Sequence, residues 1–344
     1  MRLVVLPSFD KTSVLEKRTV FAPSLSIGNV GQLAVDVLIS SGKMVLAGYL
    51  DTDLVVPVSG PNAYGGATPV APLEVYVSPS SPLAAIQQRS PIVKGKTAVY
   101  AAHLLSLLSS ARVDALVWLH SHDSGARVEA DLDIPTPLRL VHTPLPTDAA
   151  SADDSDNGGG SHNGAASHNV GGSHNGGAGG ASSSSTPSST ASAPSASSTP
   201  SASSASSDDV SDGMRLLIEV VERADKVGIP LLERDPEILP TRGIFLPGRE
   251  PLPHASDAVP SPCGLHGTAK RIHAAAADAG LPLLVVSAFA AEGNNIPDAM
   301  HMVDGLRALF NWTTDASPFP PTWTVPPSWE LLFGTRLVDT SLFM

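Results

Sequence analysis

The stretch that decides the fold is Ser26-Ile27-Gly28-Asn29-Val30-Gly31-Gln32-Leu33-Ala34, where a short apolar strand gives way to an amphipathic helix. Asn29 is a favourable N-cap residue, Gln32 stands three residues later as in a capping box, and Gly42 follows as a stop. The apolar positions share one face at helical spacing: Val30, Leu33, Ala34, Val37 and Leu38. We therefore interpret the segment as a structural turn from strand to helix.

The same run has a second interpretation as an anion-binding turn. Glycines ahead of a helix N-terminus can present backbone N–H groups to a phosphate. However, the sequence around Gly28 and Gly31 contains no G-x-G-x-x-G, no G-x-x-x-x-G-K and no lysine in the turn. An α/β enzyme that binds a nucleoside or other small anionic ligand is therefore the alternative, not the preferred interpretation.

Composition bounds the class of protein. The 344 residues are 42% hydrophobic and 16% charged, which suits a globular chain with a sizeable core. A net charge of −12 argues against general binding to nucleic acid, and no run approaches the roughly 18 apolar residues of a membrane span. The only cysteine is Cys263, so no internal disulfide forms. We expect a cytoplasmic and nuclear protein with neither nucleic acid nor membrane as a partner.

Residues 146–212 differ from the rest in composition. They are almost entirely Ser, Ala, Gly, Asn and Pro, and burial of so few large apolar groups cannot offset the entropy of ordering them. We expect a long disordered insertion there. Histidines recur at His162, His168 and His174, but a glycine-rich strand offers no preformed geometry for a metal, so we expect no metal site. A scaffold whose serine-rich insertion is phosphorylated is a third, weaker interpretation.

The two flanking halves have the pattern of an α/β protein. Strands are expected at 43–50, 54–58, 74–77, 83–89, 113–119, 243–246 and 281–290. Helices are expected at 97–108, 214–227, 267–279 and 296–310. Alternation on both sides of the insertion predicts one domain, with a central sheet flanked by helices, whose halves are residues 1–145 and 213–334.

Few residues suggest catalysis. His120-Ser121-His122-Asp123 follows a buried strand, where α/β proteins often place ligands, but no third convergent group stands at a diagnostic spacing, so a polar turn is favoured. Asp51-Thr52-Asp53 is interpreted as a capped turn, and Cys263 has too little positive charge nearby to act as a thiolate. We therefore expect no enzyme, no cofactor and no catalytic residue. At 292–295, Asn294 or Asn295 is expected to cap the helix that follows.

Several separated segments carry a family resemblance. They are the opening run, Glu292-Gly293-Asn294-Asn295-Ile296-Pro297-Asp298-Ala299, Trp323-Thr324-Val325-Pro326-Pro327-Ser328-Trp329-Glu330-Leu331-Leu332-Phe333-Gly334 and Ser341-Leu342-Phe343-Met344. Weaker likeness runs through Gly48-Tyr49, Thr52-Asp53, Val56-Pro57 and Gln88-Arg89-Ser90. In this order the chain resembles the proteasome assembly chaperone family, whose members help to build the α-ring of the 20S proteasome. The resemblance covers most of residues 19–120 and 240–344.

The resemblance implies a fold, a function and partners. The fold would be a single α/β domain with a nucleoside-phosphorylase-like sheet. The function would be to promote α-ring formation as a heterodimer with proteasome assembly chaperone 1, to block off-pathway α-ring dimers and to leave the mature particle. The family-like matches also suggest residues that build or support the heterodimer surface: Gly28, Asn29, Gly31, Gln32, Tyr49, Asp53 and Pro57.

The resemblance also assigns residues 335–344 as a docking tail. Leu342-Phe343-Met344 approximates the hydrophobic–tyrosine–any ending by which such chaperones dock between proteasome α-subunits, with phenylalanine in place of tyrosine. The missing hydroxyl should cost about 0.5–1.5 kcal/mol. Burial of Leu342 and Phe343 contributes about 1.5–3 kcal/mol each, and a millimolar complex already needs about 4 kcal/mol. The tail alone should therefore bind weakly and require a second contact from a partner chaperone.

Overall fold

The structure is a computed structural model that describes residues 1–127, 136–143, 210–230, 265–314 and 316–331. Its strands are β1 (Arg2–Val5), β2 (Thr19–Pro23), β3 (Val45–Asp51), β4 (Leu73–Val77), β5 (Leu83–Gln88), β6 (Ala115–Asp123), β7 (Leu138–His142) and β8 (Leu283–Ala290). Its helices are α1 (Val30–Ser41), α2 (Thr97–Ser110), α5 (Asp212–Val227), α6 (Gly267–Ala279) and α7 (Ile296–Leu309). Short 3-10 helices are η1 (Ile27–Asn29), η2 (Ser124–Ala126) and η3 (Pro327–Leu331).

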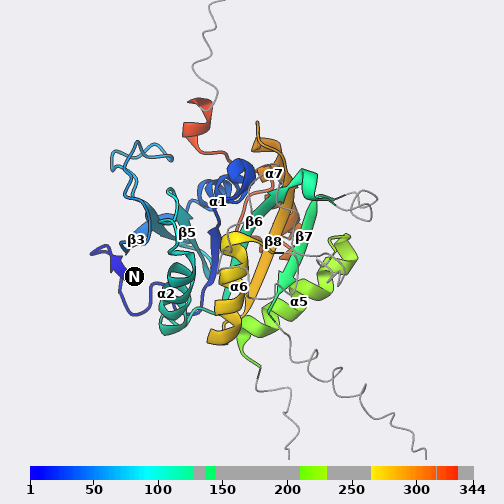
Figure 1. The fold of residues 1–344 in the computed structure, drawn as a ribbon, viewed down its shortest axis with the longest axis horizontal. Coiled ribbons are helices and arrows are strands. Elements are labelled where there is room, and N and C mark those ends of the chain that lie inside the picture. The colour runs from blue at the N-terminus through cyan, green and yellow to red at the C-terminus, as the bar shows by residue number, and fades with distance from the viewer. Residues whose placement is uncertain (128–135, 144–209, 231–264, 315, 332–344) are drawn as a thin grey trace, which may run out of the picture. The chain divides into compact units, whose positions relative to one another are not determined.

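The described strands form one mixed sheet of eight strands in the order β1-β3-β4-β5-β2-β6-β8-β7 (Figure 1). Parallel pairing joins β2 to β5 and β6, and β6 to β8, while the remaining pairs are antiparallel. The carboxyl ends of β2, β6 and β8 therefore meet at the same edge of the sheet. The expected α/β architecture, with a central sheet flanked by helices, is confirmed.

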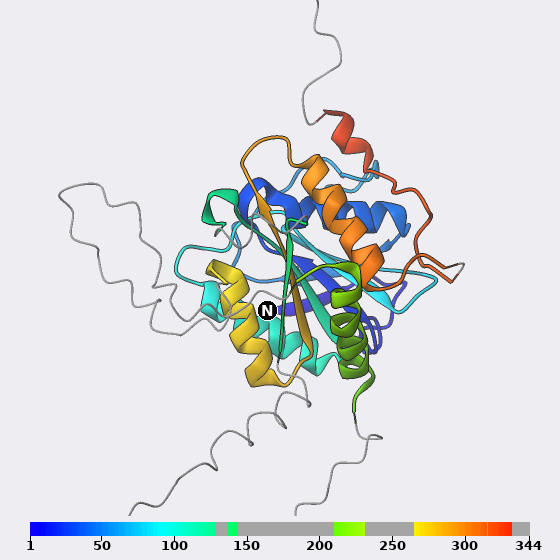
Figure 2. The ribbon, with the colours of Figure 1, turned by 90° about the vertical axis from the view of Figure 1, so that its right-hand side faces the viewer.

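Helices cover both faces of this sheet. One apolar cluster joins α1, α5 and α7 to one face, and a second joins α2 and α6 to the other. Figure 2 shows these two helical layers on opposite sides of the strands. Strand β8 is buried along its whole length because both of its faces are covered, so its sequence does not alternate between apolar and polar residues.

The start of α1 differs from the expected capping box. Asn29 occupies the N-cap position, but its backbone is left-handed (φ 53°) and its side chain makes no capping hydrogen bond. Gln32 does not reach back to Asn29; its side-chain amide donates to the backbone carbonyl of Gln88 on β5. The capping box prediction is therefore wrong, because β5 supplies an acceptor that local sequence does not reveal. Gly42 follows the helix as expected, although Lys43, not Gly42, is the left-handed residue.

Most of the expected elements are present. The strands expected at 43–50, 74–77, 83–89, 113–119 and 281–290 are β3, β4, β5, β6 and β8, with shifted ends. The helices expected at 97–108, 214–227, 267–279 and 296–310 are α2, α5, α6 and α7. The strand expected at 54–58 is wrong, because Val55 makes only a single bridge to Ile92 and Pro57 has no N–H to donate. No strand was expected at β1 or β7.

Several expectations fall outside the described residues. They are most of the insertion at 146–212, the strand at 243–246, His162, His168, His174, Cys263, and the tail with Leu342, Phe343 and Met344. After the insertion the described chain resumes with α5, where Ser211 Oγ accepts a hydrogen bond from the Met214 N–H at 3.2 Å. Within the described residues no helix combines the length and the apolar character that crossing a membrane requires.

Candidate functional site

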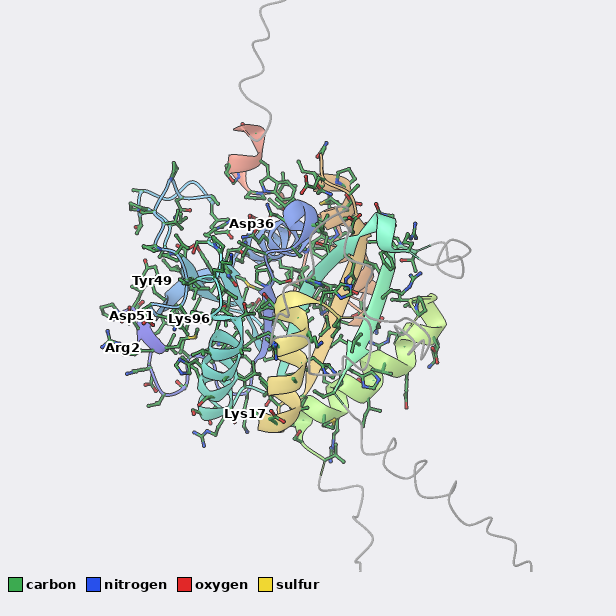
Figure 3. All side chains as sticks on the ribbon, in the orientation of Figure 1. Arg2, Lys17, Asp36, Tyr49, Asp51 and Lys96 are labelled. Atoms are coloured by element: carbon green, nitrogen blue, oxygen red, sulfur yellow. The ribbon has the colours of Figure 1, made fainter. Side chains whose placement is uncertain are left out.

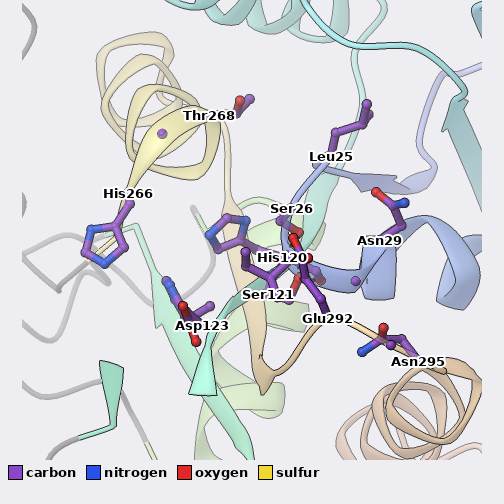
Figure 4. A pocket seen from close by; sticks show the side chains of 15 residues that line it. Leu25, Ser26, Asn29, His120, Ser121, Asp123, His266, Thr268, Glu292 and Asn295 are labelled. Carbon is purple, nitrogen blue, oxygen red and sulfur yellow. Dashed lines mark hydrogen bonds between the residues drawn. The ribbon is translucent and has the colours of Figure 1, made fainter. Parts of the chain in front are cut away.

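A pocket of about 770 Å³ lies at the carboxyl ends of the parallel strands (Figure 4). Four segments line it: residues 25–29 after β2, residues 120–123 at the end of β6, residues 266–268 at the start of α6, and residues 292, 293 and 295 after β8. This is the edge at which open α/β sheets bind ligands. The pocket is therefore the natural candidate for a small-molecule site.

Three helices begin at this pocket. Gly28 and Asn29 lead into α1, His266 is the N-cap of α6, and Asn295 is the N-cap of α7. None of these three N-cap residues makes a side-chain capping bond. At the start of α7 the N-cap position is held by Asn295, one of the two residues expected there, and Asn294 Oδ1 accepts from the Ile296 N–H at 3.2 Å. The N-termini of α1, α6 and α7, each with the partial positive charge of its helix dipole, thus face one cavity.

Three histidine rings form the wall between β6 and α6. The ring centroids of His120 and His122 are 4.7 Å apart, and those of His122 and His266 are 5.4 Å apart. Burial lowers the pKa of His120 to about 3 and that of His122 to about 4, with a further lowering from the neighbouring histidines. Burial likewise lowers the pKa of His266. The rings are therefore neutral at pH 7.

This arrangement corrects one expectation about His120-Ser121-His122-Asp123. The segment is not a polar turn, because β6 continues through Asp123, which pairs with Ala290 of β8. The third convergent group that the sequence did not reveal is His266, which arrives from α6. Among the described residues, however, no cluster of three or more such groups has a metal-binding arrangement.

The hydroxyl groups at the pocket join the ends of β2 and β6. Ser121 Oγ donates to the Ile27 carbonyl at 2.6 Å, and the Ser121 N–H donates to Ser26 Oγ at 3.0 Å. Ser24 Oγ lies 2.6 Å from His120 Nδ1, which would suit an activated nucleophile. Ser24 is only 1% exposed, so no substrate reaches it. These hydrogen bonds hold the ends of β2 and β6 together.

Gly28 and Asn295 are packed against each other at the floor of the pocket. Gly28 has a φ of 62°, and a Cβ atom there would collide with the amide group of Asn295. The Asn295 Nδ2 donates to the Ala291 carbonyl at 2.7 Å and to Asp298 Oδ2 at 3.0 Å, while its Oδ1 has no partner. The close approach therefore requires glycine at position 28 and leaves one buried acceptor unused.

The residues suggested for the heterodimer surface do not lie together. Gly28 and Asn29 line the pocket. Gly31 is buried where α1 crosses β6, and the side chain of Gln32 is used on β5. Tyr49 is half-buried on β3, at the side of the sheet that carries Arg2 and Asp51 (Figure 3).

The last two suggested residues follow β3 along the chain. Asp53 and Pro57 are exposed in the segment after the strand. There Thr52 Oγ1 accepts from the Leu54 N–H at 3.2 Å, which agrees with the turn expected at 51–53. Of the seven residues, Gly31 and Gln32 thus suit a supporting position, while Asp53 and Pro57 are accessible to a partner.

A buried ion pair was not recognised in the sequence. Arg89 donates to both carboxylate oxygens of Asp36, at 2.9 and 2.8 Å, and Tyr64 Oη donates to Asp36 Oδ1 at 2.6 Å. Burial lowers the pKa of Arg89, but the Asp36 carboxylate together with Tyr64 and Glu74 raises it, so the pKa lies above its ordinary value. The available signal was a lone acidic residue, Asp36, within the apolar α1 segment.

The segment that leads towards the tail is anchored on the core. Ser41 Oγ of α1 accepts from the Thr324 N–H at 2.8 Å, and the Ala63 carbonyl accepts from the Ser328 N–H at 3.2 Å. Trp329 is 7% exposed and packs in the same apolar cluster as α1 and α7. The residues up to 331 are thus fixed to α1 and to the segment around residue 63.

A family model for the PAC2 family matches residues 20–224, more than half of the chain. The chain belongs to the PAC2 family. The matched residues run from β2 to α5 and include the pocket residues contributed by β2, α1 and β6.

This PAC2-family chain is similar to several named proteins and to a solved structure. It is 26% identical over 342 residues to proteasome assembly chaperone 2 of Danio rerio, covering 96% of this chain and 97% of that protein. It is 37% identical over 144 residues to proteasome assembly chaperone 2 of Homo sapiens, covering 40% of this chain and 54% of that protein. Among solved structures, Pyrococcus furiosus PbaA, an archaeal homolog of proteasome-assembly chaperone, has a TM-score of 0.49 at 12% identity, covering 90% of this chain and 85% of that one.

Proposed function

We propose that this chain is a proteasome assembly chaperone that acts by binding other proteins, without catalysis. The observation that carries the proposal is the similarity to the Danio rerio proteasome assembly chaperone 2, which extends over 96% of this chain. Ser24, the serine paired with His120, is only 1% exposed, so this pair does not argue for a nucleophilic enzyme.

A finer proposal concerns the partner chaperone. The chain pairs with proteasome assembly chaperone 1, and the segment after β3 contributes to that contact. Val56 and Val58, which flank Pro57, are each 42% exposed, so this segment offers apolar surface beside the exposed Asp53. Exposed apolar side chains grouped in this way are typical of protein–protein contacts. The cytoplasm and nucleus are the proposed location.

The second finer proposal concerns the proteasome. The heterodimer binds the outer face of the α-ring, and Leu342, Phe343 and Met344 dock between α-subunits. The anchoring of Thr324 and Ser328 supports this, because a fixed base restricts where the following tail can reach. A restricted tail loses less conformational freedom on binding.

Deletion of Leu342–Met344 from the full chain tests the docking proposal. Recovery of α-subunits from extract should fall, because the tail no longer fills its pocket, while recovery of the partner chaperone should persist. Phe343→Tyr serves as the matched variant and should raise α-subunit recovery, because the added hydroxyl contributes about 0.5–1.5 kcal/mol when hydrogen-bonded. Equal recovery of α-subunits by all three chains contradicts the proposed docking.

A further inference from the structure

We propose that the outer edge of strand β1 pairs with the same edge of a second copy of this chain, so that two sheets join in a symmetric, weakly held dimer. This goes beyond the proposed chaperone function and does not depend on it. A sheet edge presents backbone N–H and C=O groups that an added strand can satisfy, and many proteins recognise one another in this way. The sheet of the described residues has two edges, β1 and β7, and they differ in how these groups are used.

The edge at β7 is covered by the chain itself. The Leu140 N–H donates to the Pro230 carbonyl at 3.1 Å, and the His142 carbonyl accepts from His273 Nε2 at 3.1 Å. Strand β7 is also buried over most of its length, although it is the last strand of the sheet. A second copy therefore finds little free backbone at this edge.

The edge at β1 is open on its outer side. The Leu6 N–H, directly after the strand, donates to the Ala47 carbonyl of β3 at 2.8 Å, so every second residue back from Leu6 faces β3. Because backbone groups alternate in direction along a strand, the N–H and C=O groups of Leu3 and Val5 point away from β3. No group of the described residues forms a hydrogen bond to them. Figure 1 shows this strand in dark blue beside the N mark, at the opposite side of the sheet from β7.

The order of residues in β1 is complementary to itself. When two copies run antiparallel with Val4 opposite Val4, each Leu3 lies opposite Val5 of the second copy, and the two residues exchange both of their hydrogen bonds. The two Val4 side chains then form a non-hydrogen-bonded pair, the kind in which side chains are closest. Val4 is 39% exposed, so apolar surface is available at the two-fold axis. Arg2 lies opposite Leu6 of the second copy, so like charges do not meet along the paired strands even though the chain has a net charge of −12.

Pairing through β1 closes at two copies. Because β7 is covered, the joined sheet has no open edge left in its described strands, and a third chain does not add to it. Pro7 has no N–H to donate, so it ends the pairing after Leu6. Strand β1 has 4 residues, so the contact belongs to the class of small, transient interfaces. We therefore expect a dimer that forms at high protein concentration and dissociates on dilution.

Cysteine cross-linking of the full chain tests the register. Cys263, the only cysteine, is first replaced by serine. In this background Val4→Cys should give a disulfide-linked dimer on mild oxidation with diamide, because Cα atoms in such a pair are about 4.5 Å apart, within reach of a disulfide. Arg2→Cys is more exposed and on the same strand, but should not cross-link, since its two copies lie about 13 Å apart along the paired strands. Val227→Cys, on α5 and also 39% exposed, controls for random collision. A cross-link at Val4 no stronger than those at Arg2 and Val227 overturns the proposal.

Sedimentation over a concentration series tests the dimer without cross-linking. Val5→Pro removes an outward N–H from each copy and keeps the bonds from β1 to β3, so it should weaken dimerisation at least about fivefold. Val4→Lys places like charges opposite each other at the axis and should also weaken the dimer, while Val227→Lys should not. Circular dichroism checks that each variant is folded.

Two results contradict the dimer. One is an unmodified chain that stays monomeric at every concentration, and the other is a V4K chain that dimerises as well as the unmodified chain. Recovery of the partner chaperone from extract is measured in parallel, so that loss of the dimer alone is distinguished from failure of the chaperone proposal. If the unmodified chain never dimerises but V4K loses the partner chaperone, the edge of β1 binds that chaperone, and the proposal of a second copy is wrong.

Discussion

At the scale of single residues, two ion pairs of similar length have very different surroundings. The Arg89–Asp36 pair is 2.8 Å long, with side chains 17% and 6% exposed, whereas the Arg2–Asp51 pair is 2.8 Å long with side chains 70% and 60% exposed. Figure 3 marks Asp36 on α1 and Arg2 with Asp51 near β1. The shared distance makes them a matched comparison of buried and exposed charge.

Asp36→Asn should strongly destabilise the fold. It removes the carboxylate that pairs with the buried Arg89 guanidinium, and loss of one partner of a buried ion pair costs about 3–5 kcal/mol. Asp51→Asn breaks the exposed pair and should cost less than about 1 kcal/mol. Urea unfolding of the two variants measures the difference. Similar midpoints would show that the buried network contributes no more than the surface pair.

The pocket histidines should make stability depend on pH. Burial lowers the pKa of His120 to about 3 and that of His122 to about 4, below the ordinary value of 6.5. The unfolded chain therefore binds protons first as the pH falls, so stability is retained above about pH 7 and lost as the pH falls from about 6.5 towards 4. Each histidine contributes a slope of up to about 1.4 kcal/mol per pH unit in that window.

Substitution of His122 isolates one part of this dependence. In His122→Phe the fall in unfolding free energy between pH 7 and pH 5 should be smaller than in the unmodified chain, since one buried proton acceptor is gone. Urea unfolding at both pH values, with His103→Phe as the exposed control, gives the comparison. An unchanged slope in H122F would contradict the low pKa of His122.

At the scale of secondary-structure elements, the sequence predicts those with a strong local pattern. β8 is apolar except for Ser287, and α6 ends at a left-handed Gly280, so both elements can be recognised in the sequence itself. β1 has only four residues at the sheet edge, and β7 carries the buried Arg139, so neither shows the strand pattern. Their presence depends on pairing with β3 and β8, which no local window contains.

The candidate site was only partly predictable for the same reason. The histidines of β6 stand beside each other in the sequence, but His266 reaches them from a separate segment. The capping bond expected from Gln32 does not form, because the Gln32 side chain donates instead to the carbonyl of Gln88, which lies 56 residues further along the chain. Composition and spacing identify candidate polar side chains in the sequence. Which of these side chains line the pocket depends on how β6, α6 and α7 come together in the fold.

Packing of α1 on β6 supplies a test at this scale. A Cβ atom at Gly31 would collide with the backbone carbonyl of Leu119. Helix propensity alone would favour alanine by about 1 kcal/mol, but overpacking against a backbone atom costs about 1–3 kcal/mol. Because a carbonyl of a central strand cannot move aside, Gly31→Ala should destabilise the fold.

Gly60→Ala is the control for this substitution. At Gly60 the nearest atom to an added Cβ atom is Val70 Cγ2 at 3.9 Å, so the side chain fits without displacement. Thermal unfolding should therefore show a lower midpoint for G31A and little change for G60A. A midpoint for G31A at or above that of the unmodified chain would mean that α1 and β6 are not in close contact.

At the scale of the whole molecule, two segments proposed to meet partners are tied to one core. Tyr64 connects the segment after β3 to Asp36 of α1 through a 2.6 Å hydrogen bond. The neighbouring Ala63 carbonyl accepts from Ser328, which precedes the tail. The segment proposed to contact the partner chaperone and the base of the tail are thus linked through the adjacent residues 63 and 64, so a change at one is expected to affect the other.

Trp329→Ala tests whether this anchoring matters for the proposed α-ring docking. Removal of the buried indole should release the base of the tail from the α1–α7 cluster, although residues 332–344 keep their sequence. Recovery of α-subunits should then fall towards that of the tail deletion, because a free base raises the conformational entropy lost on docking. Val325→Ala, at a residue 43% exposed, is the control and should leave recovery unchanged. Hydrogen exchange at 323–331 separates local release from general unfolding: faster exchange confined to this segment, together with undiminished α-subunit recovery, would mean that the tail docks without help from its base.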